Sequence, residues 1–259
     1  MKRMISTLLL IAMVAASVFA FASCEPATAA EALARADKAL TEVPYTVTMS
    51  MDFNTDNAEL NAVFDTMSME FPITVDGDNM AMDMSMALAE GMSASIKMVV
   101  VDQVLYYDMN LFGQSVKMKA TLNEEQYQEF IAENNAEMPI DPSSFATLTM
   151  EKVDGKHVIT CSGISDEGLT EMNKLLSDSL TAMGADAAVG DLSFVITVNE
   201  DKYESMALTA AYSVTIEGQT YTVSMTMNAK YAYEGVQPIT APADADSYKD
   251  VSYGEIIGQ

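Results

Sequence analysis

The sequence is poor in the residues from which most enzyme and metal sites are built. Its 259 residues contain no tryptophan, a single histidine, His157, and two cysteines, Cys24 and Cys161. It has no Gly-x-Ser-x-Gly, His-Glu-x-x-His or Cys-x-x-Cys motif and no glycine-rich phosphate loop. A Ser/His/Asp triad would have to use His157, and nothing in the sequence places a nucleophile beside it. We therefore expect a protein that is not an enzyme and that uses no cofactor and no metal.

Basic residues are scarce as well. Thirteen Lys and Arg stand against 38 Asp and Glu, which gives a formal net charge of −25 at pH 7. So acidic a surface repels nucleic acid and anionic lipid headgroups, and we expect no nucleic-acid partner. The carboxylates are spread along outward strand positions and loops, which is typical of a solvated surface. Attachment to a membrane would then have to come from a lipid and not from a basic surface.

The amino terminus has the features of a bacterial lipoprotein precursor. Lys2 and Arg3 precede the apolar segment 4–22, which ends in small residues and leads into a polar chain, as in a secretory signal. Its last residues, Phe21-Ala22-Ser23-Cys24, resemble the lipobox of bacterial lipoproteins. The resemblance implies a signal peptide over 1–23, cleavage before Cys24, and transfer of a diacylglyceryl group, with acyl chains such as palmitate, to the Cys24 thiol.

Residues 24–27 would then form a lipidated tether, and the protein would be exported and anchored at a membrane surface of the bacterial cell envelope. Two acyl chains hold a protein on a membrane far better than one. An ordinary signal peptide with an incidental cysteine is the alternative. Once Cys24 is acylated, Cys161 has no cysteine left to pair with, so we interpret it as a buried structural thiol.

Alternation of apolar and polar residues dominates the chain after Pro44. The run Met80-Ala81-Met82-Asp83-Met84-Ser85-Met86 is its clearest instance, and this period of two is typical of strands with one apolar and one wet face. Thr28 and Glu31 fit a capping box that begins a helix. Pro72 lacks an amide hydrogen, so its strand is expected at an edge or bulged. The predicted helices are 28–41, one from Asn123, and one from Ser165 to Gly184; the predicted strands are 46–54, 66–75, 80–86, 94–100, 104–109, 115–120, 145–152, 156–162, 192–198, 206–216 and 220–231; a polar, irregular tail follows from 238.

About eleven strands in a meander, with helices before and between them, exclude a parallel α/β fold. The pattern predicts a mainly antiparallel β protein with a few helices (α+β), in which 28–259 form one domain around a curled sheet.

The sequence also resembles the LolA-like group of bacterial lipoproteins and carriers, closest to uncharacterised members with a lipobox. The resemblance is carried by the leading helix, the Met80 hairpins, Tyr45-Thr46-Val47-Thr48-Met49-Ser50-Met51-Asp52, Val104-Leu105-Tyr106-Tyr107 and Gln237-Pro238-Ile239-Thr240-Ala241-Pro242-Ala243-Asp244. It implies an incomplete β-barrel that is covered by helices and encloses an apolar cavity. The shuttle role of the soluble carrier does not extend to an anchored protein.

The 22 methionines leave three interpretations open. They fill a plain core, they line an adaptable apolar cavity, or Met-x-Met strands bind Cu(I) through soft thioethers. Our main hypothesis is an anchored extracytoplasmic lipoprotein that binds a lipid or acylated molecule without catalysis. The alternative is a structural or interaction lipoprotein with a solid core and an acidic outer face, and copper binding is the third. The cavity candidates are Met49, Met51, Phe53, Met82, Met84, Met86, Met225 and Met227.

The lipobox predicts that acylation depends on Cys24 alone. Cys24→Ala is expected to abolish processing and incorporation of labelled palmitate, whereas Cys161→Ala retains both. Mass spectrometry of the amino-terminal peptide measures the outcome. An unmodified peptide that begins upstream or downstream of Cys24 in the wild type would show that the cysteine is incidental.

Overall fold

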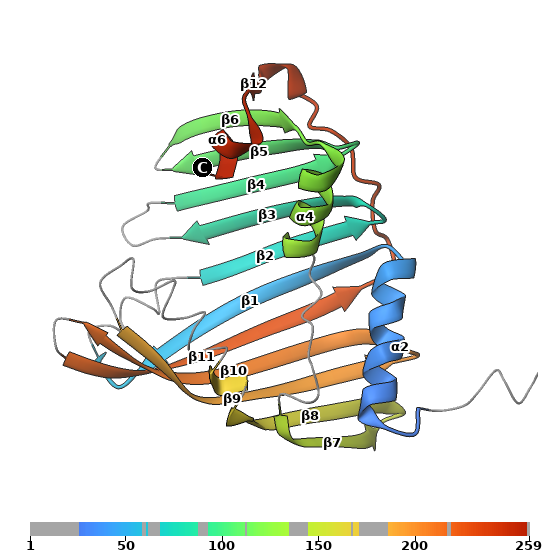
Figure 1. Ribbon diagram of the computed structural model, residues 1–259, viewed down its shortest axis with the longest axis vertical. Helices are drawn as coiled ribbons and strands as arrows, with labels where there is room; N and C mark the ends of the chain where they lie inside the picture. Colours follow the sequence, from blue (N-terminus) through green and yellow to red (C-terminus); the bar gives the residue numbers. More distant parts are fainter. Residues whose placement is uncertain are drawn as a thin grey trace, which may run out of the picture.

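The computed structural model describes residues 26–58, 61, 68–87, 93–111, 113–134, 145–166, 168–170, 186–216 and 219–257 (Figure 1). Cys24, the signal peptide and most of the helix predicted from Ser165 lie outside this part. The helices are α2 (Ala29–Glu42), α4 (Glu124–Asn134) and α6 (Tyr253–Ile257), with a 3-10 turn η3 (Ala245–Ser247). The strands are β1 (Tyr45–Thr55), β2 (Ser68–Asp76), β3 (Asn79–Ala87), β4 (Ser93–Val101), β5 (Val104–Leu111), β6 (Gln114–Thr121), β7 (Phe145–Val153), β8 (Lys156–Ile164), β9 (Asp186–Asn199), β10 (Lys202–Ile216), β11 (Gln219–Ala232) and β12 (Lys249–Asp250).

The twelve strands of the described ranges belong to one sheet, in the order β12-β6-β5-β4-β3-β2-β1-β11-β10-β9-β8-β7. Every neighbouring pair is antiparallel except β12 and β6, which are parallel. Two meanders, β1–β6 and β7–β11, meet where β1 pairs with β11. In the described part of the chain the outer strands β12 and β7 do not pair with each other, so the sheet is open. The prediction of a mainly antiparallel β protein with a few helices is confirmed.

Tight turns join successive strands in the gaps between the predicted strand ranges. Asp102 and Gln103, between β4 and β5, both have positive φ (51° and 62°), as do Glu200 and Asp201 between β9 and β10 (49° and 60°). Two consecutive residues of this kind form the turn whose twist matches that of the flanking strands. Aspartate tolerates the left-handed region better than most residues do, and each of the two turns contains one, Asp102 or Asp201.

Helix α2 begins as its sequence predicts. The Glu31 amide donates to the Thr28 hydroxyl (3.2 Å), and the Glu31 carboxylate accepts from the Ala27 amide (2.8 Å). These reciprocal bonds satisfy amide groups that have no partner within the helix. The face that carries Leu33, Ala36 and Leu40 is buried in the same core as the strands, and α2 crosses β10, β9 and β7 (Figure 1).

The prediction for Pro72 was wrong about the edge. Its strand, β2, lies inside the sheet between β1 and β3. Thr48 of β1 is its partner on one side, whereas the pairing with β3 stops at Glu70 and resumes at Ile73 without a change of register. The missing amide hydrogen is therefore accommodated by a local gap in one ladder, and no bulge is formed.

The sequence predicted an irregular tail from 238, and the structure confirms this only as far as 243. From Asp244 the tail forms η3, then β12, which pairs with Met118 and Lys119 of β6, and then α6. Tyr248 is buried and meets the ring of Tyr106 edge-on at 5.5 Å. Isolated polar residues give no periodic signal, and this order comes from contacts with β6.

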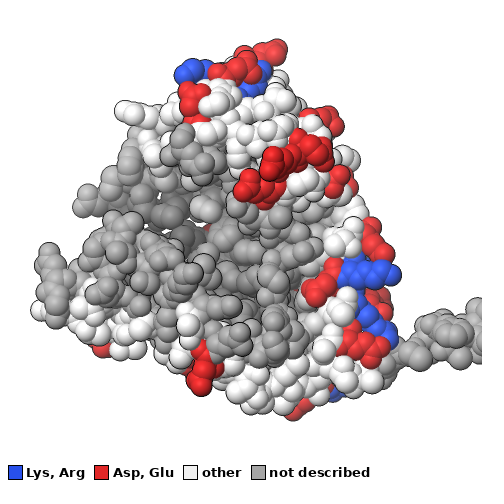
Figure 2. Space-filling model, viewed as in Figure 1, with Lys and Arg blue, Asp and Glu red and all other residues white. Residues whose placement is uncertain are grey.

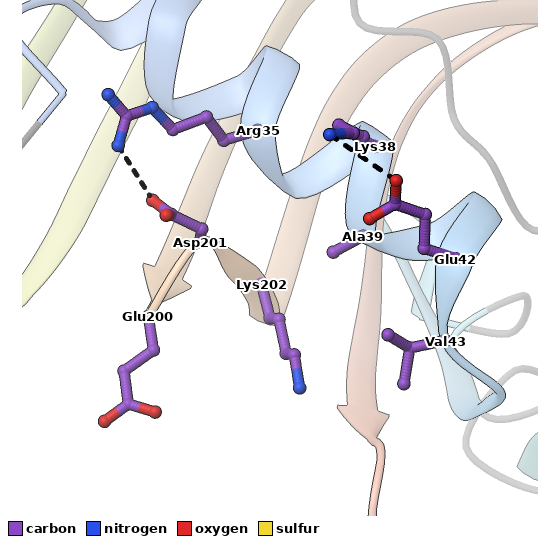
Figure 3. Close-up of a pocket in the computed structure, with 8 residues that line it drawn as sticks. All are labelled: Arg35, Lys38, Ala39, Glu42, Val43, Glu200, Asp201 and Lys202. Carbon is purple, nitrogen blue, oxygen red and sulfur yellow. Dashed lines mark ion pairs between the residues drawn. The ribbon is translucent and has the colours of Figure 1, made fainter. Parts of the chain in front are cut away.

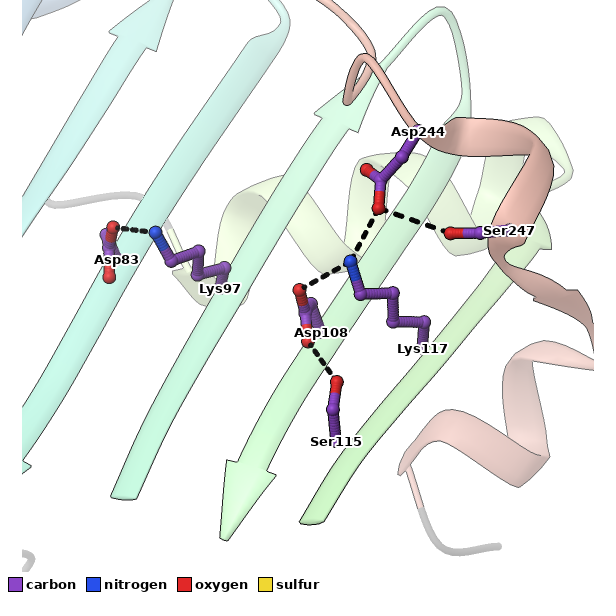
Figure 4. Close-up of polar contacts among 7 residues, drawn as sticks. All are labelled: Asp83, Lys97, Asp108, Ser115, Lys117, Asp244 and Ser247. Atoms are coloured by element: carbon purple, nitrogen blue, oxygen red, sulfur yellow. Dashed lines mark hydrogen bonds and ion pairs between the residues drawn. The ribbon is translucent and has the colours of Figure 1, made fainter. Parts of the chain in front are cut away.

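A row of alternating charges fixes the tail to the face that carries Tyr106 (Figure 4). Asp83, Lys97, Asp108 and Lys117 lie directly opposite one another across β3, β4, β5 and β6. The Lys117 ammonium lies 3.4 Å from Asp108 and 2.5 Å from Asp244 of the tail. The Lys97 ammonium lies 2.8 Å from Asp83, and this hydrogen bond raises the pKa of Lys97. Opposite charges at facing positions stabilise this pairing over registers that would separate them.

Tyr248 provides the test of tail docking. Tyr248→Ala removes a buried ring and is expected to lower the free energy of unfolding by about 3 kcal/mol. Tyr248→Phe retains the ring and is the control, with an expected change within about 0.5 kcal/mol. Urea titrations followed by circular dichroism measure both. Equal stability of Tyr248→Ala and the wild type would show that the tail does not pack on β6 in solution.

Candidate functional site

Strand register places the predicted methionine positions on one side of the sheet. In β1 and β11, Met51 is opposite Met227 and Phe53 is opposite Met225. Residues that face each other across a ladder project to the same side, so this side can be followed from strand to strand. We call it the apolar face. The eight predicted positions, Met49, Met51, Phe53, Met82, Met84, Met86, Met225 and Met227, all belong to it.

The apolar face excludes carboxylates. At its described positions, strands β1–β6 and β9–β11 carry neither Asp nor Glu, although the chain has 38 of them. In the described strands, the basic side chains of the apolar face are Lys152 of β7 and His157 of β8. These two residues lie opposite each other. Most of the acidic side chains visible in Figure 2 lie over α4, α2 and the tail, and a few lie along the lower edge of the molecule. The face therefore suits an uncharged, apolar surface and not an ion.

Burial divides the apolar face into two parts. Near α2 and α4 its side chains are fully enclosed, with Val47, Leu105 and Ile196 at 0 % exposure. Farther along the strands the side chains pack against this core yet stay partly exposed, and these are Met51, Met82, Met84, Met98, Met225 and Met227. The second part leaves apolar surface available for a ligand, which the enclosed part does not.

Tyrosines gather at the enclosed end. Tyr203 and Tyr231 have ring centroids 5.5 Å apart, and the Tyr45 ring lies 6.1 Å from Tyr231 and 6.2 Å from Tyr233. The Tyr203 hydroxyl donates to the Asp37 carboxylate of α2 at 2.5 Å. The Tyr231 hydroxyl is buried and has no hydrogen-bond partner among the described residues. Sequence reasoning missed this cluster, because Tyr203 reaches it through the irregularity between Tyr203 and Ser205 in the β9–β10 pairing.

Burial raises the pKa of three of these four phenols, namely Tyr203, Tyr231 and Tyr233. For Tyr203, the bond to Asp37 adds to the effect of burial, since a phenolate beside a carboxylate is unfavourable. For Tyr231, nearby Tyr233 and Asp37 act in the same direction. Burial raises the pKa of Tyr233 to about 12. These three phenols are therefore neutral at physiological pH.

An apolar pocket of about 210 Å³ opens at the enclosed end, between the end of α2, the β2–β3 turn and α4. It is lined by Leu40, Thr41, Tyr45, Val75, Gly77, Asp78, Met80 and Ile131. The Tyr127 hydroxyl of α4 donates to the Asp78 carbonyl and holds α4 beside this turn. The pocket therefore connects the enclosed core with the outside of the molecule between two helices.

A second pocket, of about 350 Å³, lies outside the apolar face, between α2 and the β9–β10 turn (Figure 3). Its charges are of both signs and largely pair with each other: Arg35 lies 3.6 Å from Asp201, and Lys38 lies 3.4 Å from Glu42. The Lys202 ammonium sits 5.0 Å from the centroid of the Tyr233 ring. These mixed charges favour no particular ligand, so this pocket is the weaker candidate.

The described residues contain no group of three His, Cys, Asp or Glu side chains that would hold a metal ion. Cys161 is buried, and burial raises the pKa of its thiol. Nor does any helix in the described ranges have the length and apolarity to cross a membrane.

Residues 28–249 match a family of unknown function (DUF6612). The chain belongs to this family. The match runs from the cap of α2 to the start of β12 and therefore includes strands β1 to β11. No curated protein matches the sequence. The function of this DUF6612 chain has therefore to be argued from the apolar face itself.

The tyrosine cluster predicts how stability depends on pH. Above pH 10 the phenols ionise in the unfolded chain while burial keeps them protonated in the folded one. Each such group lowers the free energy of unfolding by up to about 1.4 kcal/mol per pH unit. Tyr231→Phe loses no hydrogen bond, so we expect stability at pH 7 within about 0.5 kcal/mol of wild type and a shallower alkaline slope.

Tyr203→Phe is the matched variant, because it leaves Asp37 without the hydroxyl. This substitution is expected to lower the free energy of unfolding by about 2 kcal/mol at pH 7. Urea unfolding between about pH 7 and 11 compares the two variants. An alkaline slope in Tyr231→Phe as steep as in the wild type would contradict the buried, neutral state of Tyr231.

Proposed function

We propose that the protein is a membrane-anchored lipoprotein of the bacterial envelope that binds a lipid or acylated molecule on its apolar face, without catalysis. In this proposal the open sheet curls into an incomplete β-barrel, and α2 and α4 cover its enclosed end. Cys24 carries the lipid anchor, because an acidic chain has little attraction for anionic membrane surfaces.

One observation supports the proposal most directly. Six methionines on a face without carboxylates remain partly exposed, although the strands have enough apolar residues to enclose the opposite end completely. A soluble surface rarely leaves large connected apolar areas unless they serve binding. Methionine is flexible and polarisable, so such a surface adapts to acyl chains of different shapes.

The apolar pocket between α2 and α4 adds to this support. Tyr45 and Met80 line it and are otherwise buried, so it reaches the enclosed end of the face. Its volume of about 210 Å³ suits part of an acyl chain. A ligand lying along the methionines would extend toward this pocket.

Native mass spectrometry of residues 25–259, purified without detergent from a lipid-containing host, tests the proposal. Bound lipid at fixed stoichiometry is expected, and solvent extraction would identify its class. A mass without ligand, together with no uptake of added fatty acid or phospholipid, would favour the structural or interaction lipoprotein instead.

Two neighbouring residues of β3 provide matched variants. Met84 is on the apolar face, and exposed Ser85 is on the opposite side. Met84→Gln keeps the size of the side chain and adds a polar amide, so we expect about tenfold weaker lipid binding. Ser85→Gln adds the same amide outside and should bind lipid as the wild type does. An equal loss of lipid affinity in both variants would exclude the apolar face as the binding surface.

A further inference from the structure

The apolar pocket between α2 and α4 changes character between its interior and its opening. Tyr45 and Met80, which line it, are 1 % and 2 % exposed, whereas Asp78 of the β2–β3 turn lines it and is exposed. The apolar part of the lining is formed by Leu40, Tyr45, Val75, Met80 and Ile131. The pocket therefore leads from a buried apolar interior to an opening that carries a carboxylate.

Two more carboxylates gather at the same opening. The Tyr127 hydroxyl of α4 donates to the Asp78 backbone carbonyl, which places this phenol beside the pocket. Burial raises the pKa of Tyr127, and the nearby carboxylates of Asp78, Glu124 and Asp102 raise it further. They come from the β2–β3 turn, the start of α4 and the β4–β5 turn. We call these three carboxylates the acidic rim.

No positive charge balances the acidic rim in the described part of the chain. None of its carboxylates forms an ion pair there, and no described Lys or Arg lines the pocket. Figure 2 shows acidic atoms gathered over α4 without Lys or Arg among them. An opening with charges of one sign raises the local concentration of ions of the other sign. The acidic rim therefore favours a cation.

The basic side chains of the apolar face lie far from this opening in the sheet. Lys152 and His157 belong to β7 and β8, and four strands, β1, β11, β10 and β9, separate β8 from β2. At the opening, an anionic head group would meet the acidic rim and find no described cation to offset it. An apolar chain with an anionic head is therefore a poor fit to this pocket.

We infer that the lipid or acylated molecule of the proposed function has a head group with an ammonium, which lies at the acidic rim while the acyl chain enters the apolar pocket. The inference rests on the proposed function, because an ammonium alone gains little from exposed carboxylates in water. Burial of the chain provides the affinity, and the acidic rim selects the charge of the head group.

Amphiphiles with the same dodecyl chain separate the effect of the head group from that of the chain. The full lipoprotein is purified from membranes in dodecyl maltoside, whose uncharged head makes it the reference ligand. Dodecyltrimethylammonium or dodecanoate is then added at about pH 8, where a carboxylic acid is ionised, and native mass spectrometry measures how far each replaces the maltoside. We expect dodecyltrimethylammonium to bind about tenfold more tightly than dodecanoate. Choline, which has the head group and no chain, is expected to displace nothing at the same concentration.

Two triple variants remove the same charge from different places. The rim variant combines Asp78→Asn, Asp102→Asn and Glu124→Gln. The matched variant neutralises three exposed acids on the opposite side of the sheet, Asp52→Asn, Glu70→Gln and Glu151→Gln. We expect the rim variant to bind both charged amphiphiles about equally and the matched variant to retain the wild-type preference. Asp78→Asn alone, at an exposed position, is expected to reduce the preference by about threefold.

The inference is overturned if dodecanoate binds the wild type as tightly as dodecyltrimethylammonium does, if the rim variant keeps the wild-type preference, or if the matched variant loses as much of it. Equal binding of the two charged amphiphiles would reject the ammonium head group and leave the proposed function standing. Absence of any bound dodecyl amphiphile would reject the proposed function itself.

Discussion

The strict separation of acidic and apolar residues between the two sides of the sheet is the constraint on which this structure depends. Side chains of a strand alternate between faces, so a slip of one residue in a pairing would turn Asp52, Glu70 or Asp83 toward the core. Burying an unpaired carboxylate is strongly unfavourable. An excess of acid therefore does more than keep the chain soluble: in strands such as β1, β2, β3 and β5 it penalises the register that is wrong by one residue.

The few basic residues reinforce the same pairing from the outer side. Lys97 and Lys117 alternate with Asp83 and Asp108 across four strands, and the row continues to Asp244 of the tail. Each exposed pair contributes little stability. Together, however, these pairs favour one alignment of β3 to β6 and hold the tail over β6. The apolar face on one side of the sheet and the charged row on the other therefore favour the same register.

Alternation of apolar and polar residues predicted most strands, and Thr28 with Glu31 predicted the start of α2, because these features depend on neighbours in sequence. The strand position of Pro72 and the order of the tail after Asp244 were predicted wrongly, since these depend on contacts with β3 and β6. For the candidate site, the alternation of residues along each strand predicted that the methionines share a face. It did not predict that Met51 would lie between Met227 and Met69, nor that Tyr203 would join Tyr231 and Tyr45. Those facts follow from strand order and from an irregular ladder, which local patterns do not encode.

The pairing of β1 with β11 has a consequence for how the chain folds. Every other long pairing joins strands that are consecutive in sequence, so each meander forms with little loop closure, whereas β1 waits for a partner near the opposite end of the chain. If the polypeptide is exported amino terminus first, the early meander leaves the membrane with one side of β1 unpaired and its methionines uncovered. Such an intermediate is prone to aggregate until β11 arrives. A chaperone outside the cytoplasm, or slow release from the export channel, would protect it during that interval.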